Sequence, residues 1–403
     1  MAFGRYIGSS PRGGHRGRFH VSTSLKWWAA PAIAVLTATA CAGFDEPALQ
    51  PVTTISLTRV AIPPISGKSA QFDIMAIDQE HHQVFAADAL DQGIDIVDVS
   101  SAPAHYLRTV HLDSVPNGVA YAPDLHRLYT GNTDSSVSVI DVDPSSPTSY
   151  KVLTTISTGG VGSTDLVDYD THDHKIYATN PDDGFVSAID ATSNTVVAQI
   201  QNLGTTEQPA YNAADGMEYV PGADNNTIIK IDPRRDVVVG TPSPIPVVCV
   251  PHGLAIDPAT DQGLIGCGDK DNLVTVAWDF HTGTMLKAFD FAGGGDQVVF
   301  DAKAGHFYFA AQGYAPPEMA IFNASPITFL TAVPTSHHSL NVAYDETHHL
   351  LYTIDGRHLE ASLWSFPDPV FGCAGHEAVL AAEGAPRSQT PDCHPEQQTA
   401  GGA

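Results

Sequence analysis

Short alternations of apolar and polar residues, separated by turn-forming residues, make up most of this chain. The clearest stretch, Lys175 to Ile200, contains three such segments. Alternation with a period of two predicts β-strands with one buried face. Asn180–Gly184 and Asp190–Asn194 supply the Asn, Asp and Gly residues that tight turns require. This stretch therefore predicts three consecutive antiparallel strands.

The same pattern recurs along the chain, and each copy carries an aromatic or large apolar residue in its second strand. These residues are spaced by 42 to 48 positions: Phe85, Tyr129, Tyr177, Tyr219, Leu264, Tyr308 and Tyr352. Repeats of about 40–50 residues with three or four short strands each are typical of β-propellers. The sequence therefore predicts an all-β fold: one seven-bladed β-propeller with four-stranded antiparallel blades.

The two ends of the repeat region predict how the ring closes. The last repeat stops after its third strand, at Leu363–Phe366, while Thr53–Ile62 resembles the outermost strand of another repeat, Val152–Ser157. Pairing the first strand with the last repeat would remove exposed sheet edges. We therefore expect the N-terminal strand to complete the last blade of a propeller that spans residues 52–366.

The charge balance narrows the choice of partner. The formal net charge is −26, and the first 40 residues hold five basic residues and no acidic one, so the remainder carries about −31. Such a surface repels nucleic acid and anionic lipid and attracts cations. We therefore expect no nucleic-acid partner. The alternative is that the acidic surface serves solubility alone.

Residues 1–41 have the features of an export signal. Basic residues precede an apolar run, Trp27–Ala40, that is too short to span a bilayer and ends in small residues before Cys41. We expect lipidation of Cys41 and anchoring in the cell envelope, periplasmic or on the cell surface. Ordinary cleavage near Ala40 is the alternative. Residues 42–51 would then be a linker, and residues 367–403, rich in Ala, Gly and Pro, a C-terminal tail.

The cysteine count agrees with an oxidising compartment. If Cys41 carries lipid, four of the five cysteines remain for disulfides. Closeness in sequence predicts that Cys249 pairs with Cys267 and that Cys373 pairs with Cys393, the latter tethering the tail. Free buried thiols are the alternative.

The third repeat resembles the YVTN family of β-propellers, which includes YncE-like periplasmic proteins. The resemblance rests on Ile176–Asn180, Gly184–Asp190 and Asn194–Val197, and the second repeat matches it in Leu128–Asn132 and Val137–Asp141. It implies the fold strongly and the function weakly, because propellers host enzymes, ligand traps and scaffolds alike. The family's link to single-stranded DNA does not fit a chain without a basic groove.

Alignment of the repeats on the aromatic position predicts which residues meet at one mouth of the central channel. These are Asp73, Asn117, Asp165, Glu207, His252, Asp296 and Leu340, with His338 close by. Crowded like charges raise one another's pKa or require a counter-ion. We therefore predict a ligand site here, with Asp165, Glu207, His252 and Asp296 as candidate ligands of a divalent cation. The alternative is turn chemistry and water.

Established catalytic motifs such as HExxH and GxSxG do not occur in the sequence. We therefore expect a monomeric, non-catalytic scaffold that binds a protein or small-molecule ligand in the cell envelope through its acidic channel face. The alternative is a metal-dependent hydrolase or lyase, lactonase-like, in which a metal ion at the channel mouth activates water.

Overall fold

The computed structural model of the 403-residue chain describes most of the repeat region. The described residues are 55–63, 72–268, 273–313, 316–336, 339–356 and 361–371. The predicted leader 1–41 with Cys41, the linker 42–51, His338, Cys373 and Cys393 lie outside them. No helix long and apolar enough to cross a membrane occurs in the described part.

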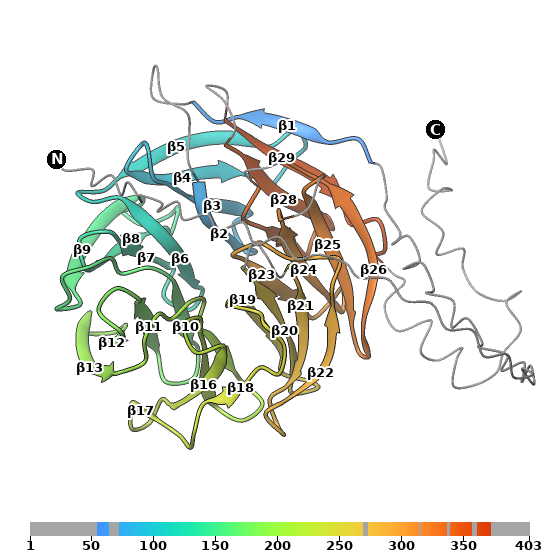
Figure 1. Ribbon diagram of the computed structural model, residues 1–403. Helices are drawn as coiled ribbons and strands as arrows, with labels where there is room; N and C mark the ends of the chain where they lie inside the picture. The colour runs from blue at the N-terminus through green and yellow to red at the C-terminus, as the bar shows by residue number, and fades with distance from the viewer. Residues whose placement is uncertain are drawn as a thin grey trace, which may run out of the picture. The chain divides into compact units, whose positions relative to one another are not determined.

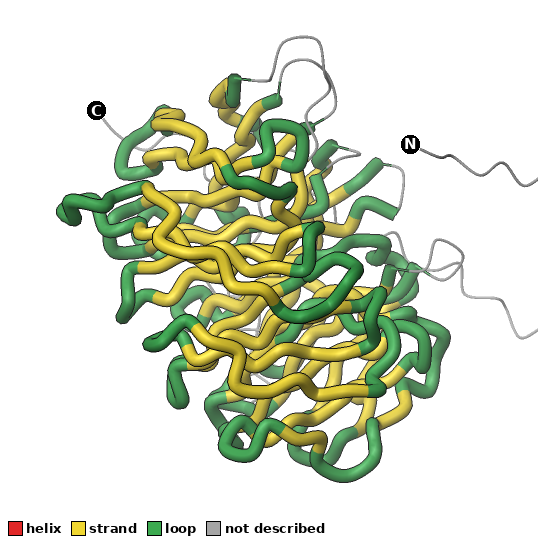
Figure 2. Tube along the Cα trace, turned by 90° about the vertical axis from the view of Figure 1, so that its left-hand side faces the viewer, coloured by secondary structure: helices red, strands yellow, loops and turns green. Residues whose placement is uncertain are grey.

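Seven antiparallel sheets follow one another around a ring, as the sequence predicts (Figure 1). Each sheet is a blade; in blades 1 to 6 the first strand in sequence lies innermost. Seen from the side, the strands run across the propeller and the turns gather at its two faces (Figure 2). Within the described ranges the regular secondary structure consists of strands alone.

Blades 1 to 3 each have four strands in sequence order. Blade 1 contains β2 (Phe72–Asp78), β3 (Gln83–Asp88), β4 (Gly93–Asp98) and β5 (His105–His111). Blade 2 contains β6 (Pro116–Ala122), β7 (Arg127–Asn132), β8 (Ser136–Asp141) and β9 (Lys151–Ser157). Blade 3 contains β10 (Val167–Asp170), β11 (Lys175–Asn180), β12 (Phe185–Asp190) and β13 (Thr195–Gln201).

Blades 4 to 6 follow the same order, with a split outer strand in blade 4. Blade 4 contains β14 (Ala210–Asn212), β15 (Met217–Gly222), β16 (Thr227–Asp232), β17 (Val237–Val238) and β18 (Ser243–Pro244). Blade 5 contains β19 (Pro251–Asp257), β20 (Gln262–Cys267), β21 (Thr275–Asp279) and β22 (Thr284–Phe289). Blade 6 contains β23 (Val298–Asp301), β24 (His306–Ala311), β25 (Glu318–Ala324) and β26 (Ile327–Pro334).

Blade 7 closes the ring in the predicted manner. It contains β27 (Ala343–Asp345), β28 (Leu350–Asp355) and β29 (Ser362–Pro367), and its outermost strand is β1 (Thr58–Ala61). β1 pairs antiparallel with β29, with Thr58 opposite Ser365 and Ala61 opposite Ser362 (Figure 1). Hydrogen bonds between the two ends of the repeat region therefore hold the propeller shut.

The aromatic residue of each repeat packs between neighbouring blades. Phe85, Tyr129, Tyr177 and Tyr308 are fully buried. Because these side chains stand on second strands, they form successive apolar clusters around the ring. The repeat is thus visible in the sequence because each blade must supply one large apolar group to the next interface.

Packing continues past Phe366, where the tail was predicted to start. Asp368 is buried and accepts a hydrogen bond from the Tyr308 hydroxyl at 2.7 Å. Phe371 stacks on the His349 ring at 3.4 Å between centroids. Residues 367–371 therefore pack against blades 6 and 7.

The turns between first and second strands share one backbone design. The carboxylates of Asp78, Asp170 and Asp345 accept hydrogen bonds from backbone N–H groups two and three residues further on. Four residues after the end of the inner strand, the backbone has positive φ. Non-glycine residues at this position are His82, His126, His174, Asp261 and His349. Asn, Asp and His are the side-chain-bearing residues that tolerate this conformation best.

The predicted disulfide between Cys249 and Cys267 is present. Both cysteines are fully buried in the apolar cluster between blades 4 and 5. The bridge ties the segment that precedes β19 to the end of β20 in the same blade. It therefore restricts a short loop of the unfolded chain.

We predict that replacing both cysteines, Cys249→Ser with Cys267→Ser, lowers the free energy of unfolding by about 2–4 kcal/mol, because the unfolded chain regains loop entropy. Urea denaturation of the purified protein measures the change. Reducing agent should destabilise the wild type by a similar amount and leave the double variant unaffected. Equal stability of the two proteins under oxidising conditions would contradict the prediction.

Candidate functional site

Residues at the start of the inner strands, or two to three positions before it, meet at one end of the central channel. Asp73, Asp165, Glu207, His252 and Asp296 come from blades 1, 3, 4, 5 and 6, and we call these five residues the channel mouth. The His252 Nδ1 atom lies 3.2 Å from Asp296 Oδ1 and 3.9 Å from Glu207 Oε2. The charges of Asp165, Asp296 and Glu207 all act on Asp73. The structure thus brings these five predicted residues together, whereas their role in ligand binding stays a prediction.

Backbone hydrogen bonds between neighbouring blades fix the strands of the channel mouth. The Asp165 carbonyl accepts a hydrogen bond from Gly118 N–H at 3.1 Å, and the His252 carbonyl accepts one from Gln208 N–H at 3.2 Å. Gly131 is required nearby, because a Cβ at this position would lie 1.9 Å from the Asp165 carbonyl oxygen. The carboxyls therefore cannot easily move apart to relieve their repulsion.

Burial and mutual repulsion raise the pKa of each of three channel-mouth carboxyls. Burial is the main cause for Asp73, whose pKa rises well above its ordinary value, and the charges of Asp165, Asp296 and Glu207 add to it. Burial, followed by the charge of Asp296, raises the pKa of Asp165 to about 6. Burial raises the pKa of Glu207 to about 7, although the nearby His252 opposes the rise.

His252 is the basic partner of these acids. Burial lowers its pKa, but the hydrogen bond to Asp296 and the charges of Glu207, Asp296 and Asp165 outweigh burial and raise it overall. Gly268 makes room for the ring, since a Cβ there would lie 2.5 Å from imidazole atoms. One imidazolium cannot balance four carboxylates, so the channel mouth retains protons or attracts a further cation.

Two other predicted members of the site, Asn117 and Leu340, bring no charge to it. The Asn117 amide donates a hydrogen bond to the Thr164 carbonyl at 3.1 Å, so it joins blade 2 to the segment before blade 3. Leu340 is half-buried. His338, which was predicted to enter the same space, lies outside the described residues. The described site is therefore built from the four acids and His252.

Two acidic residues in loops on the same face, Asp183 and Asp224, accept hydrogen bonds that hold those loops. Asp183 Oδ2 accepts hydrogen bonds from Val161 N–H at 2.8 Å and Gly162 N–H at 2.9 Å. Asp224 Oδ2 accepts hydrogen bonds from the backbone and side chain of Thr205. These carboxylates hold loops in place. At the channel mouth, by contrast, the carboxyls lie beside one another and beside His252.

The four candidate metal ligands do not form the tightest groups of ligand atoms. Among the described residues, three groups have ligand atoms that all lie within 4.8 Å of one another. They are Glu80, His81 and His126; His82, Asp345 and His348; and Asp88, Asp91 and Asp95. None of the three belongs to the channel mouth, so metal binding by Asp165, Glu207, His252 and Asp296 stays a prediction.

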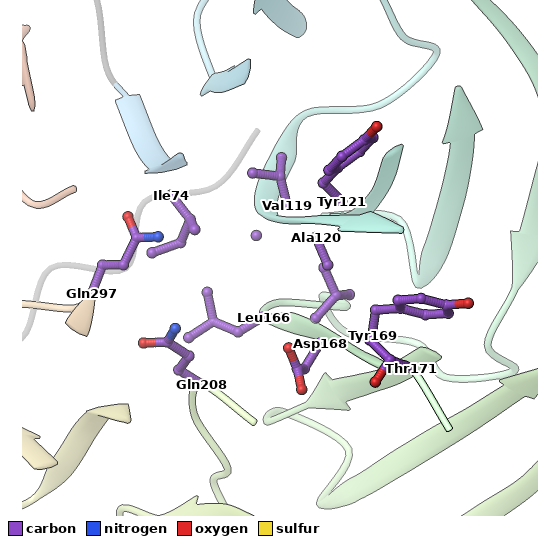
Figure 3. Close-up of a pocket in the computed structure, with 12 residues that line it drawn as sticks. Ile74, Val119, Ala120, Tyr121, Leu166, Asp168, Tyr169, Thr171, Gln208 and Gln297 are labelled. Atoms are coloured by element: carbon purple, nitrogen blue, oxygen red, sulfur yellow. The ribbon is translucent and has the colours of Figure 1, made fainter. Parts of the chain in front are cut away.

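A cavity of about 210 Å³ continues the channel beyond its mouth. Figure 3 shows Ile74, Leu166, Gln208 and Gln297, each the neighbour in sequence of a channel-mouth acid, arranged around it. Asp168 also lines the cavity, and burial raises its pKa to about 6 despite hydrogen bonds from backbone N–H groups. The channel thus stays polar below its mouth.

Two glutamines of this cavity were not predicted from the sequence. The Gln297 amide accepts hydrogen bonds from Met75 N–H at 3.2 Å and Val342 N–H at 3.0 Å, and donates one to the Met75 carbonyl at 2.7 Å. It therefore joins the inner strands of blades 6, 7 and 1. Gln208 accepts a hydrogen bond from Leu254 N–H at 3.1 Å. Their position next to Asp296 and Glu207 was the only signal in the sequence.

We predict that Glu207→Gln stabilises the protein at alkaline pH. Because the folded pKa of Glu207 is about 7 and its ordinary value is 4.5, folding favours the protonated form. The wild type therefore loses stability as the pH rises from about 4.5 through about 7. The glutamine variant should be more stable at pH 8 by up to about 3 kcal/mol and nearly equal at pH 4.5.

Urea unfolding at the two pH values measures this difference. Glu80→Gln, at an exposed position on the opposite face, is the matched control and should show no such pH-dependent gain. A Glu207→Gln variant that is less stable than the wild type at pH 8 would mean that Glu207 is satisfied as a carboxylate.

Comparison with known proteins identifies the fold but no family. No family profile matches this chain, and no curated protein does either. The resemblance to the YVTN and YncE-like proteins therefore stays a prediction. The chain is similar to a propeller chain in a solved structure described as "Crystal Structure of Mitotic Checkpoint Complex", with a TM-score of 0.60 and 16% sequence identity. The match covers 77% of this chain and 94% of that one. With seven four-stranded blades in a closed ring, this chain is a seven-bladed β-propeller.

Proposed function

We propose that this protein is a non-catalytic scaffold that binds a cationic segment of a partner protein at the channel mouth. The observation that carries the proposal is the convergence of four carboxyls from four blades, where burial and then the neighbouring charges raise the pKa of Asp73, Asp165 and Glu207. A lysine or arginine side chain would neutralise charges that the fold holds together at a cost.

The arrangement favours an ammonium or guanidinium group over a bare metal ion. Two of the acids lie around an imidazole: His252 Nδ1 is 3.2 Å from Asp296 Oδ1 and 3.9 Å from Glu207 Oε2. A side chain with several N–H donors can bond to such dispersed oxygens. The fold is also consistent with protein binding, because the propeller chain of similar structure is part of a protein complex.

We further infer that binding takes place outside the cytoplasm. The buried Cys249–Cys267 disulfide supports an oxidising compartment. The basic and apolar leader before Cys41 supports export and lipid anchoring in the cell envelope. Mass spectrometry of the mature N-terminus tests the anchor, because diacylglycerol on Cys41 is expected and an unmodified N-terminus near residue 41 would contradict it.

A fluorescein-labelled tetralysine peptide tests the binding proposal. We predict that Asp165→Asn with Glu207→Gln weakens its binding by at least roughly tenfold, which corresponds to about 1.4 kcal/mol. Affinity for the wild type should rise between pH 5.5 and pH 8, because Asp165 with a pKa of about 6 and Glu207 with a pKa of about 7 ionise in that range. Fluorescence anisotropy at low salt measures both effects.

The matched control removes two charges from the opposite face, as Asp98→Asn with Asp143→Asn. Their turn-capping oxygens, which accept hydrogen bonds from Ser100 and Ser145 N–H, are retained by asparagine. The control should bind the peptide nearly as well as the wild type. Equal weakening in both double variants would assign the affinity to net charge alone and overturn the proposed site.

A further inference from the structure

The face opposite the channel mouth gathers histidines from neighbouring blades. In four blades the positive-φ position of the turn after the inner strand is a histidine: His82, His126, His174 and His349. In the sequence such residues look like exposed turn positions. The structure instead places several of them in contact across blade boundaries, with the His82 and His348 ring centroids 5.5 Å apart.

Three of the four histidines each lie beside a tyrosine of their own blade. A tyrosine at the end of the inner strand lies near Nδ1 of the histidine five residues on, in the pairs Tyr121–His126 at 3.4 Å, Tyr169–His174 at 2.8 Å and Tyr344–His349 at 3.1 Å. In blade 1 the corresponding residue is Ile77, which has no hydroxyl. The Nδ1 atom of His82 is buried and has no hydrogen-bond partner among the described residues.

His82 lies beside His348 and Asp345 of blade 7, which contact each other. His348 Nδ1 lies 2.6 Å from Asp345 Oδ2, and the Asp345 side chain is fully buried. Asp345 Oδ1 also accepts hydrogen bonds from the N–H groups of Thr347 and His348, which fix its orientation. One ligand atom from each of His82, Asp345 and His348 lies within 4.8 Å of the others.

We propose that His82, Asp345 and His348 form a binding site for a transition-metal dication of the zinc class. Two imidazoles and one carboxylate are the ligand set that such ions accept, and water can complete the coordination. The unpartnered His82 Nδ1 supplies a lone pair or a proton that none of the described groups uses. Calcium and magnesium are disfavoured, because they prefer oxygen ligands.

The site spans the junction where the ring closes. His82 belongs to blade 1, whereas Asp345 and His348 belong to blade 7, which is completed by β1. A bound ion would join the first and last blades on the face opposite the channel mouth. The ion would thus stabilise closure of the ring. This metal site is independent of the proposed peptide-binding function.

Zinc titration of the untagged, EDTA-treated full chain tests the proposal. His82→Asn and His348→Asn should each weaken the binding of one zinc equivalent by roughly 10- to 100-fold and abolish the zinc-dependent rise in melting temperature. Asparagine also tolerates positive φ, so the His82 turn is preserved. The matched control is His174→Asn, which changes a turn histidine of the same backbone conformation and should bind zinc as the wild type does.

A second group of possible ligands, Glu80, His81 and His126, lies between blades 1 and 2. The His81→Asn variant shows whether zinc binds to this second group or to His82, Asp345 and His348. The proposal is overturned if zinc binding is unchanged in both His82→Asn and His348→Asn, if it is lost only in His81→Asn, or if His174→Asn weakens it equally. Isothermal titration calorimetry at pH 7.5 measures affinity and stoichiometry. Absorption of the cobalt-substituted protein reports whether histidine nitrogens coordinate the ion.

Discussion

Closure of the ring is the constraint on which the chemistry of this protein depends. Each inner strand begins at the same end of the channel, so closing seven blades forces their first side chains into one small space. Four of these side chains are carboxyls, and the backbone bonds at Asp165 and His252 leave them little freedom to separate. The energy that packs the blades together therefore also buries these carboxyls beside one another. Burial, with the charges of neighbouring acids adding to it, raises the pKa of Asp165 to about 6 and of Glu207 to about 7.

The same constraint gives the two faces of the propeller different chemistry. At the channel mouth, acids from four blades lie near one histidine, and the loop acids Asp183 and Asp224 accept backbone hydrogen bonds. On the opposite face, histidines that occupy the positive-φ turn position meet acids and histidines of the next blade. One face is suited to a cationic group of a partner, and the other to a metal ion that holds neighbouring blades together.

Much of the fold could be predicted from the sequence, because the repeat is local. The buried second-strand residues, such as Tyr129 and Tyr177, set the number of blades, and alignment on them also placed Asp73, Asp165, Glu207 and Asp296 at one mouth. Contacts between blades were not predictable in this way. The bonds from Gln297 to Met75 and Val342 join three blades, and the approach of His82 to His348 joins residues far apart in the chain. Neither leaves a periodic signal, because each occurs once.

The central claim is that ring closure holds protonatable carboxyls together at the channel mouth. The most direct measurement is an NMR titration of protein with ¹³C-labelled aspartate and glutamate side-chain carboxyls, assigned with the Asp165→Asn and Glu207→Gln variants. The structure predicts midpoints at about pH 6 for Asp165 and about pH 7 for Glu207. Midpoints near the ordinary value of about 4 for both residues would show that the carboxyls are solvated and apart, and would contradict the account.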